Sequence, residues 1–169
     1  VMIVALLNQK GGVGKTTLSI LAAEALAVAQ RPTLLVDMDP LATCSDLMLA
    51  RYDRQPSLTV TDWLSGACGE SSFPPMLSTW LDIVPADNRL EDVLTEMSAN
   101  PARVFDLRTA LGELAHVRKH DFVIIDAPPS LSALAWASII AADVVIVPTL
   151  ADPTSIKGLT NVMKQIEDI

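Results

Sequence analysis

Residues 10–17 read Lys10-Gly11-Gly12-Val13-Gly14-Lys15-Thr16-Thr17, between a short apolar run at residues 2–7 and an Ala/Leu-rich run at residues 17–30. A loop that cradles phosphates needs backbone N–H groups that point inward, which glycines permit, and a helix N-terminus that adds partial positive charge. The glycines and the helix that follows meet both needs. In such a loop Lys15 bridges the β- and γ-phosphates, the Thr16 hydroxyl ligates Mg²⁺, and Thr17 reaches the α-phosphate. The stretch therefore predicts a strand–loop–helix unit that binds a nucleotide.

The rest of the chain alternates between strand-like and helix-like segments. Short apolar runs rich in branched residues predict strands at residues 2–7, 33–37, 81–85, 122–126 and 144–147. Helices are expected at residues 17–30, 88–97, 102–118, 130–141 and 154–168, with a short one at 60–64 anchored by a buried Trp63. A capping residue before proline marks two helix starts, Asn100-Pro101 and Asp152-Pro153. The alternation predicts a single α/β domain over residues 1–169, with a mostly parallel sheet flanked by helices on both faces, as in Rossmann-like P-loop NTPases.

The composition agrees with buried strands and closely packed helices. Half of the residues are hydrophobic but only 4% are aromatic, so the apolar content is mainly Ala, Val, Ile and Leu. A net charge of -8 and a pI near 4.6 argue against a strongly basic nucleic-acid surface. Cys44 and Cys68 match no CxxC or metal-binding spacing, so neither a disulfide framework nor a zinc site is indicated, and a reduced cytoplasmic setting is expected.

The most apolar stretch, residues 131–147, is interpreted as a buried helix followed by a buried strand. Ser132, Ser138 and Asp143 interrupt it, Pro148 ends it, and it is shorter than the ~20 apolar residues that a membrane helix needs. Stable membrane insertion is therefore not expected. The N-terminal apolar run is short and has no basic leader, so a signal peptide is not expected either.

Carboxylates gather directly after the predicted strands, where α/β sheets bind their ligands. Asp37 and Asp39 follow the second strand, and because residues two apart can face the same side, both carboxylates can point into one site. Asp126 ends a very apolar run, the arrangement of a Walker B strand. Three carboxylates beside a triphosphate would repel it, so a metal ion is required. The alternative interpretation is that each aspartate only caps a helix or a turn.

The phosphate loop departs from the general pattern at one point. Gln9 stands where a glycine is usual, and Lys10 stands directly before Gly11-Gly12. In this respect the loop resembles the deviant Walker A motif KGGxGK[ST] of the ParA/MinD family, and most of all that of ParA/Soj-type partition ATPases. The resemblance implies that Lys10 reaches across a dimer interface to the partner's ATP and stabilises the transition state there. ATP and Mg²⁺ are the implied cofactors, and ATP-dependent homodimerisation would switch on hydrolysis.

The family's two switch motifs are present in part. Asp37-Met38-Asp39-Pro40 resembles switch I, which implies that Asp39 orients or activates the attacking water and that Asp37 holds a Mg²⁺-bound water. Asp126-Ala127-Pro128-Pro129-Ser130 resembles switch II, which implies that Asp126 binds Mg²⁺ through water. After the switch I proline the family usually has Gln-Gly-Asn, whereas this chain has Leu41-Ala42-Thr43. Slow basal turnover is therefore expected.

The resemblance covers nearly the whole chain and also implies partners. Family members continue with another strand, a base-contacting loop and C-terminal helices, so the chain is expected to be a truncated or naturally short version. The implied function is an ATP-hydrolysing dimerisation switch in DNA partition or intracellular positioning, with a ParB-like partner that stimulates hydrolysis. Nonspecific DNA is a further implied ligand, and the implied location is the cytoplasm, in association with the nucleoid.

Three other functions have less support in the sequence. A MinD-like membrane-cycling ATPase usually relies on a C-terminal amphipathic helix, and none is visible. A P-loop metabolic ligase needs substrate-binding polar groups beyond the phosphates, for which the sequence offers no clear cluster. An electron-donating iron-protein relative needs paired cysteines at a dimer interface, and Cys44 and Cys68 are not placed for this.

Several remaining polar and flexible residues are given structural roles. His116 and His120 are expected to complement the dipole at a helix C-terminus. The basic residues Arg51, Arg54, Lys157 and Lys164 are expected to be solvated. The methionines Met38, Met48, Met76 and Met97 are predicted to fill the core or an interface.

Overall fold

The fold is built on a six-stranded sheet in the order β3-β4-β2-β5-β1-β6. The computed structural model describes residues 1–67, 74–151, 156, 159–160, 162–164 and 166. The strands are β1 (Met2–Leu6), β2 (Thr33–Asp37), β3 (Met76–Ser78), β4 (Leu81–Val84), β5 (Phe122–Asp126) and β6 (Val144–Ile146). β3 pairs antiparallel with β4, and the other neighbouring pairs are parallel. The predicted mostly parallel α/β fold is confirmed.

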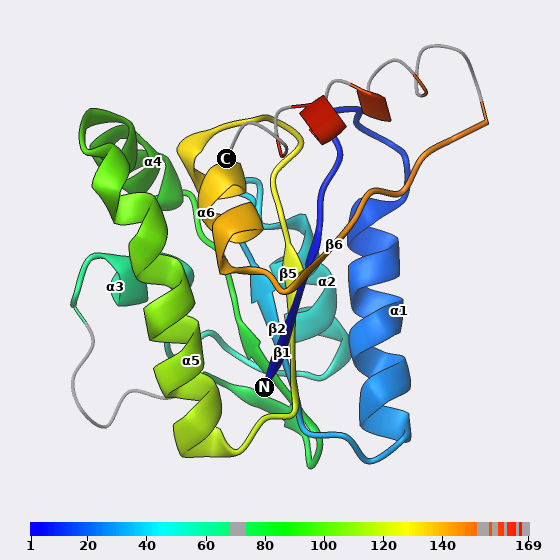
Figure 1. The fold of residues 1–169 in the computed structure, drawn as a ribbon. Helices are drawn as coiled ribbons and strands as arrows, with labels where there is room; N and C mark the ends of the chain where they lie inside the picture. Colours follow the sequence, from blue (N-terminus) through cyan, green and yellow to red (C-terminus); the bar gives the residue numbers. More distant parts are fainter. Residues whose placement is uncertain (68–73, 152–155, 157–158, 161, 165, 167–169) are drawn as a thin grey trace.

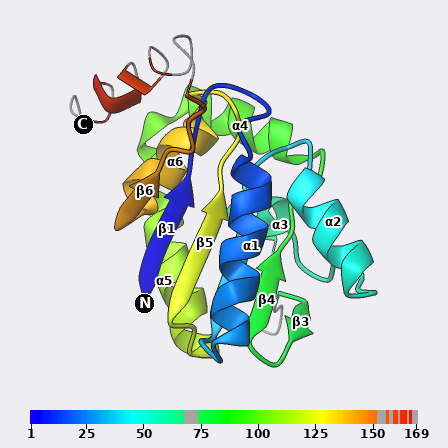
Figure 2. The same ribbon diagram turned by 90° about the vertical axis from the view of Figure 1, so that its right-hand side faces the viewer.

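Helices cover both faces of the sheet (Figures 1 and 2). Along β2, Leu35 packs in one apolar cluster with side chains of α1 and α2, whereas Leu34 and Val36 belong to a second cluster with side chains of α3 to α6. This alternation is why the central residues of a strand buried on both faces are apolar. The helices are α1 (Lys15–Val28), α2 (Thr43–Arg51), α3 (Val60–Leu64), α4 (Leu90–Ala99), the 3₁₀ helix η1 (Pro101–Phe105), α5 (Asp106–Arg118) and α6 (Ala133–Ala141).

The strand register brings the predicted site residues to one edge of the sheet. Asp126 at the end of β5 pairs with Leu6 at the end of β1 and with Asp37 at the end of β2. The loop after β1, the loop after β2 and the loop after β5 therefore leave the sheet side by side. This edge lies at the top of Figure 1, where α1 begins.

Two elements have no counterpart in the sequence prediction. Helix α2 buries Cys44, Ser45 and Met48 on one face but carries no clear local start signal, since it begins after Ala42 in a left-handed conformation. Strand β3 is a three-residue edge strand, too short to give a periodic pattern. Met76 in this strand is 54% exposed, so the prediction that it fills the core is wrong. The same prediction is confirmed for Met38, Met48 and Met97, which are buried.

Other local expectations need correction. The helix expected at residues 102–118 is a 3₁₀ turn followed by α5, and Asn100 makes no side-chain capping bond in the described structure. Trp63 is only partly buried, against the main apolar cluster. The Asp152-Pro153 start and much of the helix expected at 154–168 lie outside the described residues.

His120 does not complement a helix dipole. It follows Lys119, which ends α5 in a left-handed conformation, and its buried Nε2 lies 3.0 Å from Oδ2 of Asp82 in β4. His116 does lie in the last turn of α5. Among the helices that the structure describes, none has the length and apolar content that crossing a membrane requires.

Candidate functional site

The loop between β1 and α1 forms a hollow at the carboxyl edge of the sheet. Gly12 and Gly14 have φ values of 74° and 88°, which favour glycine because a Cβ would be strained there. Residues Gly12, Val13, Gly14, Lys15, Thr16 and Thr17 line a cavity of about 180 Å³. In the described structure no side chain caps the start of α1, and no acidic residue stands in its first turn. The first backbone N–H groups of α1 are thus left for an anion.

The two lysines of the loop have different surroundings. Lys15 begins α1, is only 8% exposed, and its charge lowers the pKa of Asp126 against the stronger effect of burial. Lys10 is half-buried, and its backbone N–H donates to Oδ1 of Asn8 at 2.9 Å. The Asn8 amide donates in turn to the carbonyl of Pro148 at 2.6 Å. Asn8 therefore fixes the start of the loop to the segment after β6, a contact between residues far apart in sequence.

Asp126 is the centre of a hydrogen-bond network with α1. It is 1% exposed. The hydroxyl of Thr16 donates to its Oδ2 at 2.7 Å, and the hydroxyl of Ser19 donates to its Oδ1 at 2.9 Å. Burial raises the pKa of Asp126, and the negative charge of Asp39 adds to this effect, so Asp39 also lies near this carboxylate. The structure thus brings together the predicted residues Thr16, Asp126 and Lys15.

Asp37 is fully buried at the end of β2 and accepts three hydrogen bonds. The backbone N–H of Asp39 donates to Oδ1 at 3.0 Å, while the backbone N–H and hydroxyl of Ser45 donate to Oδ2 at 2.9 and 2.7 Å. Burial raises the pKa of Asp37 to about 7, and the nearby charge of Asp126 adds to the rise, although the hydrogen bonds from Ser45 and Asp39 oppose it.

Asp39 lies in the turn between β2 and α2. Its Oδ1 accepts the backbone N–H of Leu41 at 3.0 Å, and its carbonyl accepts that of Ala42 at 2.8 Å. Both Asp37 and Asp39 therefore do cap a turn, as the alternative interpretation had it. A capping role does not explain why Asp37 is completely buried beside the carboxylate of Asp126. Burying two carboxylates together is costly unless a cation neutralises them. Leu41, which replaces the family's glutamine, is 73% exposed.

The oxygen atoms around Asp126 fit a magnesium ion. Mg²⁺ prefers hard oxygen ligands and is commonly held by one or two carboxylates, water and substrate phosphates. Two buried carboxylates, Asp37 and Asp126, and the Thr16 hydroxyl supply such atoms at the edge of the sheet where residues 12–17 line the hollow. Within the part of the chain that the structure describes, no group of three or more His, Cys, Asp or Glu residues could hold a metal alone. The phosphates of a nucleotide would have to complete the coordination.

Sequence reasoning did not single out Asn8, Ser19 or Ser45 as site residues. Ser19 stands four residues after Lys15, a spacing that puts both on one face of α1 and could have indicated its place. Ser45 is brought to Asp37 by α2, a helix that was not predicted. Asn8 begins the polar stretch that follows the first strand, but its bond to the carbonyl of Pro148 joins residues 140 positions apart and has no local signal.

The whole chain, residues 1–169, matches the protein-family model described as an AAA domain. The chromosome partitioning protein ParA of Caulobacter vibrioides is 37% identical over 174 residues, which cover 99% of this chain and 62% of that protein. The chain thus spans less than two thirds of the length of this relative. A structure of cobyrinic acid a,c-diamide synthase from Mycobacterium smegmatis, with bound ADP and magnesium, is 30% identical with a TM-score of 0.85, over 99% of this chain and 67% of that one. Apo McdA from Cyanothece has a TM-score of 0.88 at 21% identity, over 99% and 65% of the two chains, and shows the same fold.

Proposed function

We propose that this chain, which belongs to the ParA/MinD family of P-loop ATPases, binds and hydrolyses ATP as the nucleotide domain of a ParA-type partition ATPase. One observation carries the proposal. The phosphate loop with its two lysines and the Thr16–Asp126 hydrogen bond lie at the same edge of the sheet as the buried carboxylate of Asp37. A phosphate cradle beside two buried carboxylates is the arrangement that a magnesium-bound nucleotide requires.

We assign the phosphates of the nucleotide to the loop, and the metal ion to Thr16 and two aspartates. Backbone N–H groups of Gly11 to Thr17 would surround the phosphates, and Lys15 would contact the β- and γ-phosphates. The hydroxyl of Thr16 and, through water, the carboxylates of Asp37 and Asp126 would hold Mg²⁺. When bound, the ion neutralises phosphate charge and so makes the terminal phosphorus more open to attack. The existing contact between Thr16 and Asp126 supports this assignment because it places both groups at one point.

Hydrolysis is assigned to Asp39 and Lys10. Asp39 would orient the attacking water, and its nearness to Asp126 supports a position at the phosphate side of the turn. Lys10 would act on the ATP of a second copy of this chain. An ammonium group about 4 Å from a phosphate oxygen is worth roughly 4 kcal/mol at an effective dielectric constant of about 20. A charge supplied in trans in this way would couple dimerisation to hydrolysis.

The partners follow from the family and are part of the proposal. The related protein from Caulobacter vibrioides is named a chromosome partitioning protein. We therefore assign to this chain an ATP-dependent homodimer, a ParB-like partner that stimulates hydrolysis, and binding of the dimer to nonspecific DNA at the nucleoid. The net charge of -8 makes any DNA-binding surface a local one.

A metabolic ligase remains the second candidate, because the structure described as cobyrinic acid a,c-diamide synthase is 30% identical to this chain. A ligase of that kind consumes ATP only with a carboxylic acid and an amide nitrogen donor. A partition ATPase would instead consume ATP in a manner that depends on dimer formation, DNA and its partner. Steady-state ATP turnover with each set of additions separates the two.

The decisive experiment measures nucleotide binding and molecular size for three variants. Lys15→Ala should abolish binding of ATP with Mg²⁺. Lys10→Ala should leave binding by the monomer largely intact but remove ATP-dependent dimerisation and hydrolysis, whereas Asp39→Ala should accumulate an ATP-bound dimer. Lys119→Ala, at the far end of α5, is the control for loss of a lysine. Equal loss of binding in Lys10→Ala and Lys15→Ala would rule out the role in trans.

A further inference from the structure

Ser45 is a buried polar residue in the first turn of α2 that makes contacts in two directions. Its side chain and backbone together are 1% exposed. Its hydroxyl and its backbone N–H both donate to Oδ2 of Asp37, at 2.7 and 2.9 Å. The same hydroxyl accepts the backbone N–H of Ala86 at 2.8 Å. Ser45 therefore joins the end of β2 to the segment that follows the neighbouring strand β4.

The direction of these bonds is fixed by the chemistry of the hydroxyl. A serine hydroxyl has one proton to donate and lone pairs to accept with. A backbone N–H can only donate, so the bond from Ala86 occupies a lone pair of Ser45. The single proton of Ser45 is then directed at the carboxylate of Asp37. The hydroxyl thus selects one orientation of Asp37 and satisfies a second buried group at the same time.

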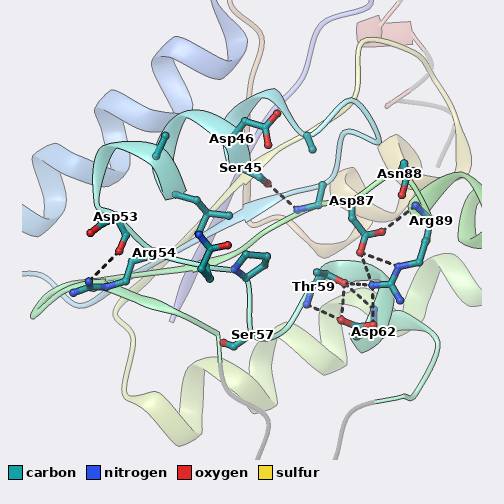
Figure 3. A pocket seen from close by; sticks show the side chains of 16 residues that line it. Ser45, Asp46, Asp53, Arg54, Ser57, Thr59, Asp62, Asp87, Asn88 and Arg89 are labelled. Atoms are coloured by element: carbon teal, nitrogen blue, oxygen red, sulfur yellow. Dashed lines mark hydrogen bonds and ion pairs between the residues drawn. The ribbon is translucent and has the colours of Figure 1, made fainter.

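The segment after Ala86 is held from its other side by a charged cluster. Arg89 forms ion pairs with Asp62 at 2.9 Å and with Asp87 at 2.5 Å. These side chains line a cavity of about 730 Å³ between α2, the start of α3 and residues 86–89 (Figure 3). Ser45 also lines this cavity, and its bond to the backbone of Ala86 is drawn in Figure 3. The segment is therefore tied both to the charged cluster and, through Ser45, to Asp37.

The packing of α2 does not depend on the Ser45 hydroxyl. Cys44 and Met48 of this helix are buried in the apolar cluster beneath α1, and Arg51 near its end forms an ion pair with Glu24 of α1 at 2.7 Å. Loss of the hydroxyl would leave Asp37 with backbone donors only and would leave the buried N–H of Ala86 without its acceptor. The predicted damage is thus to the orientation of Asp37 rather than to the attachment of the helix.

We propose that Ser45 is a positioning residue for magnesium: through its hydroxyl it holds Asp37 in the orientation that receives the Mg²⁺-bound water, and it anchors that orientation to the 86–89 segment. This inference rests on the proposed function, since it concerns the Mg²⁺-nucleotide complex of the same site. Partners of direct metal ligands typically contribute about 10–100-fold to metal affinity. Because Asp37 meets the ion through water, the contribution of Ser45 is expected at the lower end of this range, about 10-fold. The proposed role of Ser45 is exerted through Asp37, to which its hydroxyl and backbone N–H both donate.

The test is a magnesium titration of nucleotide binding by Ser45→Ala, followed with a fluorescent ATP analogue. Ser45→Ala should bind the analogue in EDTA as the unaltered chain does, but should need roughly 10-fold more Mg²⁺ for the magnesium-dependent increase in affinity. Ser45→Thr, which keeps a hydroxyl, should bring the required Mg²⁺ concentration most of the way back to that of the unaltered chain. Ser138→Ala removes another fully buried serine hydroxyl, one that donates to the carbonyl of Leu134 within α6, and should leave the titration unchanged.

The outcomes separate this inference from the proposed function. If the unaltered chain shows no magnesium-dependent nucleotide binding, the proposed function fails. If it does and Ser45→Ala titrates identically, the positioning role is refuted while the function stands. If Ser45→Ala does not fold, the same titration on Ser45→Cys, whose thiol fills the site but is only a weak donor, decides the matter. The role would also be refuted if Ser45→Ala and Ser138→Ala changed the required Mg²⁺ concentration by the same factor.

Discussion

Asp37 should make the nucleotide-free protein less stable as the pH rises from about 4 to about 7. Burial raises the pKa of this carboxyl group from 3.8 to about 7 in the folded chain. Below pH 3.8 the group is protonated in both the folded and the unfolded states, so it adds no penalty. Between the two pKa values the unfolded chain releases the proton more readily, and stability falls as pH rises. Above pH 7 the whole penalty is present.

The size of the effect follows from the two pKa values. A rise from 3.8 to about 7 corresponds to roughly 4 kcal/mol of unfolding free energy at most. For a chain of 169 residues this is a fall of roughly 10 °C in the melting temperature. Asp126 also has a raised pKa and contributes with the same sign. The lowered pKa values of Asp62, Asp87 and Asp143 act below pH 4, because these groups lose their partners only when protonated.

Urea denaturation at a series of pH values from 4 to 8, without nucleotide or Mg²⁺, measures the effect. Asp37→Asn has no ionisable group at this position, so the decrease in stability over this range should be much smaller than in the unaltered chain. The comparison uses the slope with pH, since the amide also changes the hydrogen bonds with Ser45 at every pH. Asp46→Asn removes an exposed carboxylate from the same region, in the first turn of α2, and is the control. An unchanged slope in Asp37→Asn would show that this carboxylate is not the cause.

Three further predictions concern the stability of the fold around the site. Ala42 has a left-handed conformation with φ 53°, so Ala42→Gly should raise the unfolding free energy by roughly 0.5–1 kcal/mol in urea denaturation, and a decrease would contradict the strain. Thr59 and Asp62 form the capping box of α3, so Thr59→Ala should cost about 1 kcal/mol while nucleotide affinity stays unchanged; a loss of affinity would place the box in the site. Asp82→Ala would leave His120 buried without its partner and should lower the unfolding free energy by roughly 2–3 kcal/mol in urea denaturation. The control is Asp121→Ala, which removes an exposed carboxylate that pairs with Arg31, and a smaller loss of stability in Asp82→Ala than in this control would argue against the buried pair.

Local patterns account for much of what could be predicted. The bounds of β2 and β5 agree with the predicted strands at 33–37 and 122–126, since the central residues of a strand buried on both faces are apolar. The short helix α3 was placed at its observed residues, 60–64. Failures occurred where tertiary contacts override local preference. Helix α2 exists because Cys44 and Met48 bury against the sheet. The segment expected to be one helix at 102–118 begins instead as the 3₁₀ helix η1, and α5 follows it.

The sequence by itself determined the phosphate loop and the strands around it, because glycine spacing and apolar runs act on the chain within a few residues. Only the tertiary structure decided which polar groups meet. The parallel register sets Asp37 beside Asp126, helix α1 brings Ser19 to Asp126, and helix α2 brings Ser45 between Asp37 and Ala86. These pairs are eight to more than one hundred residues apart in the chain. Their contacts depend on the packing of whole helices and strands, which no short pattern encodes.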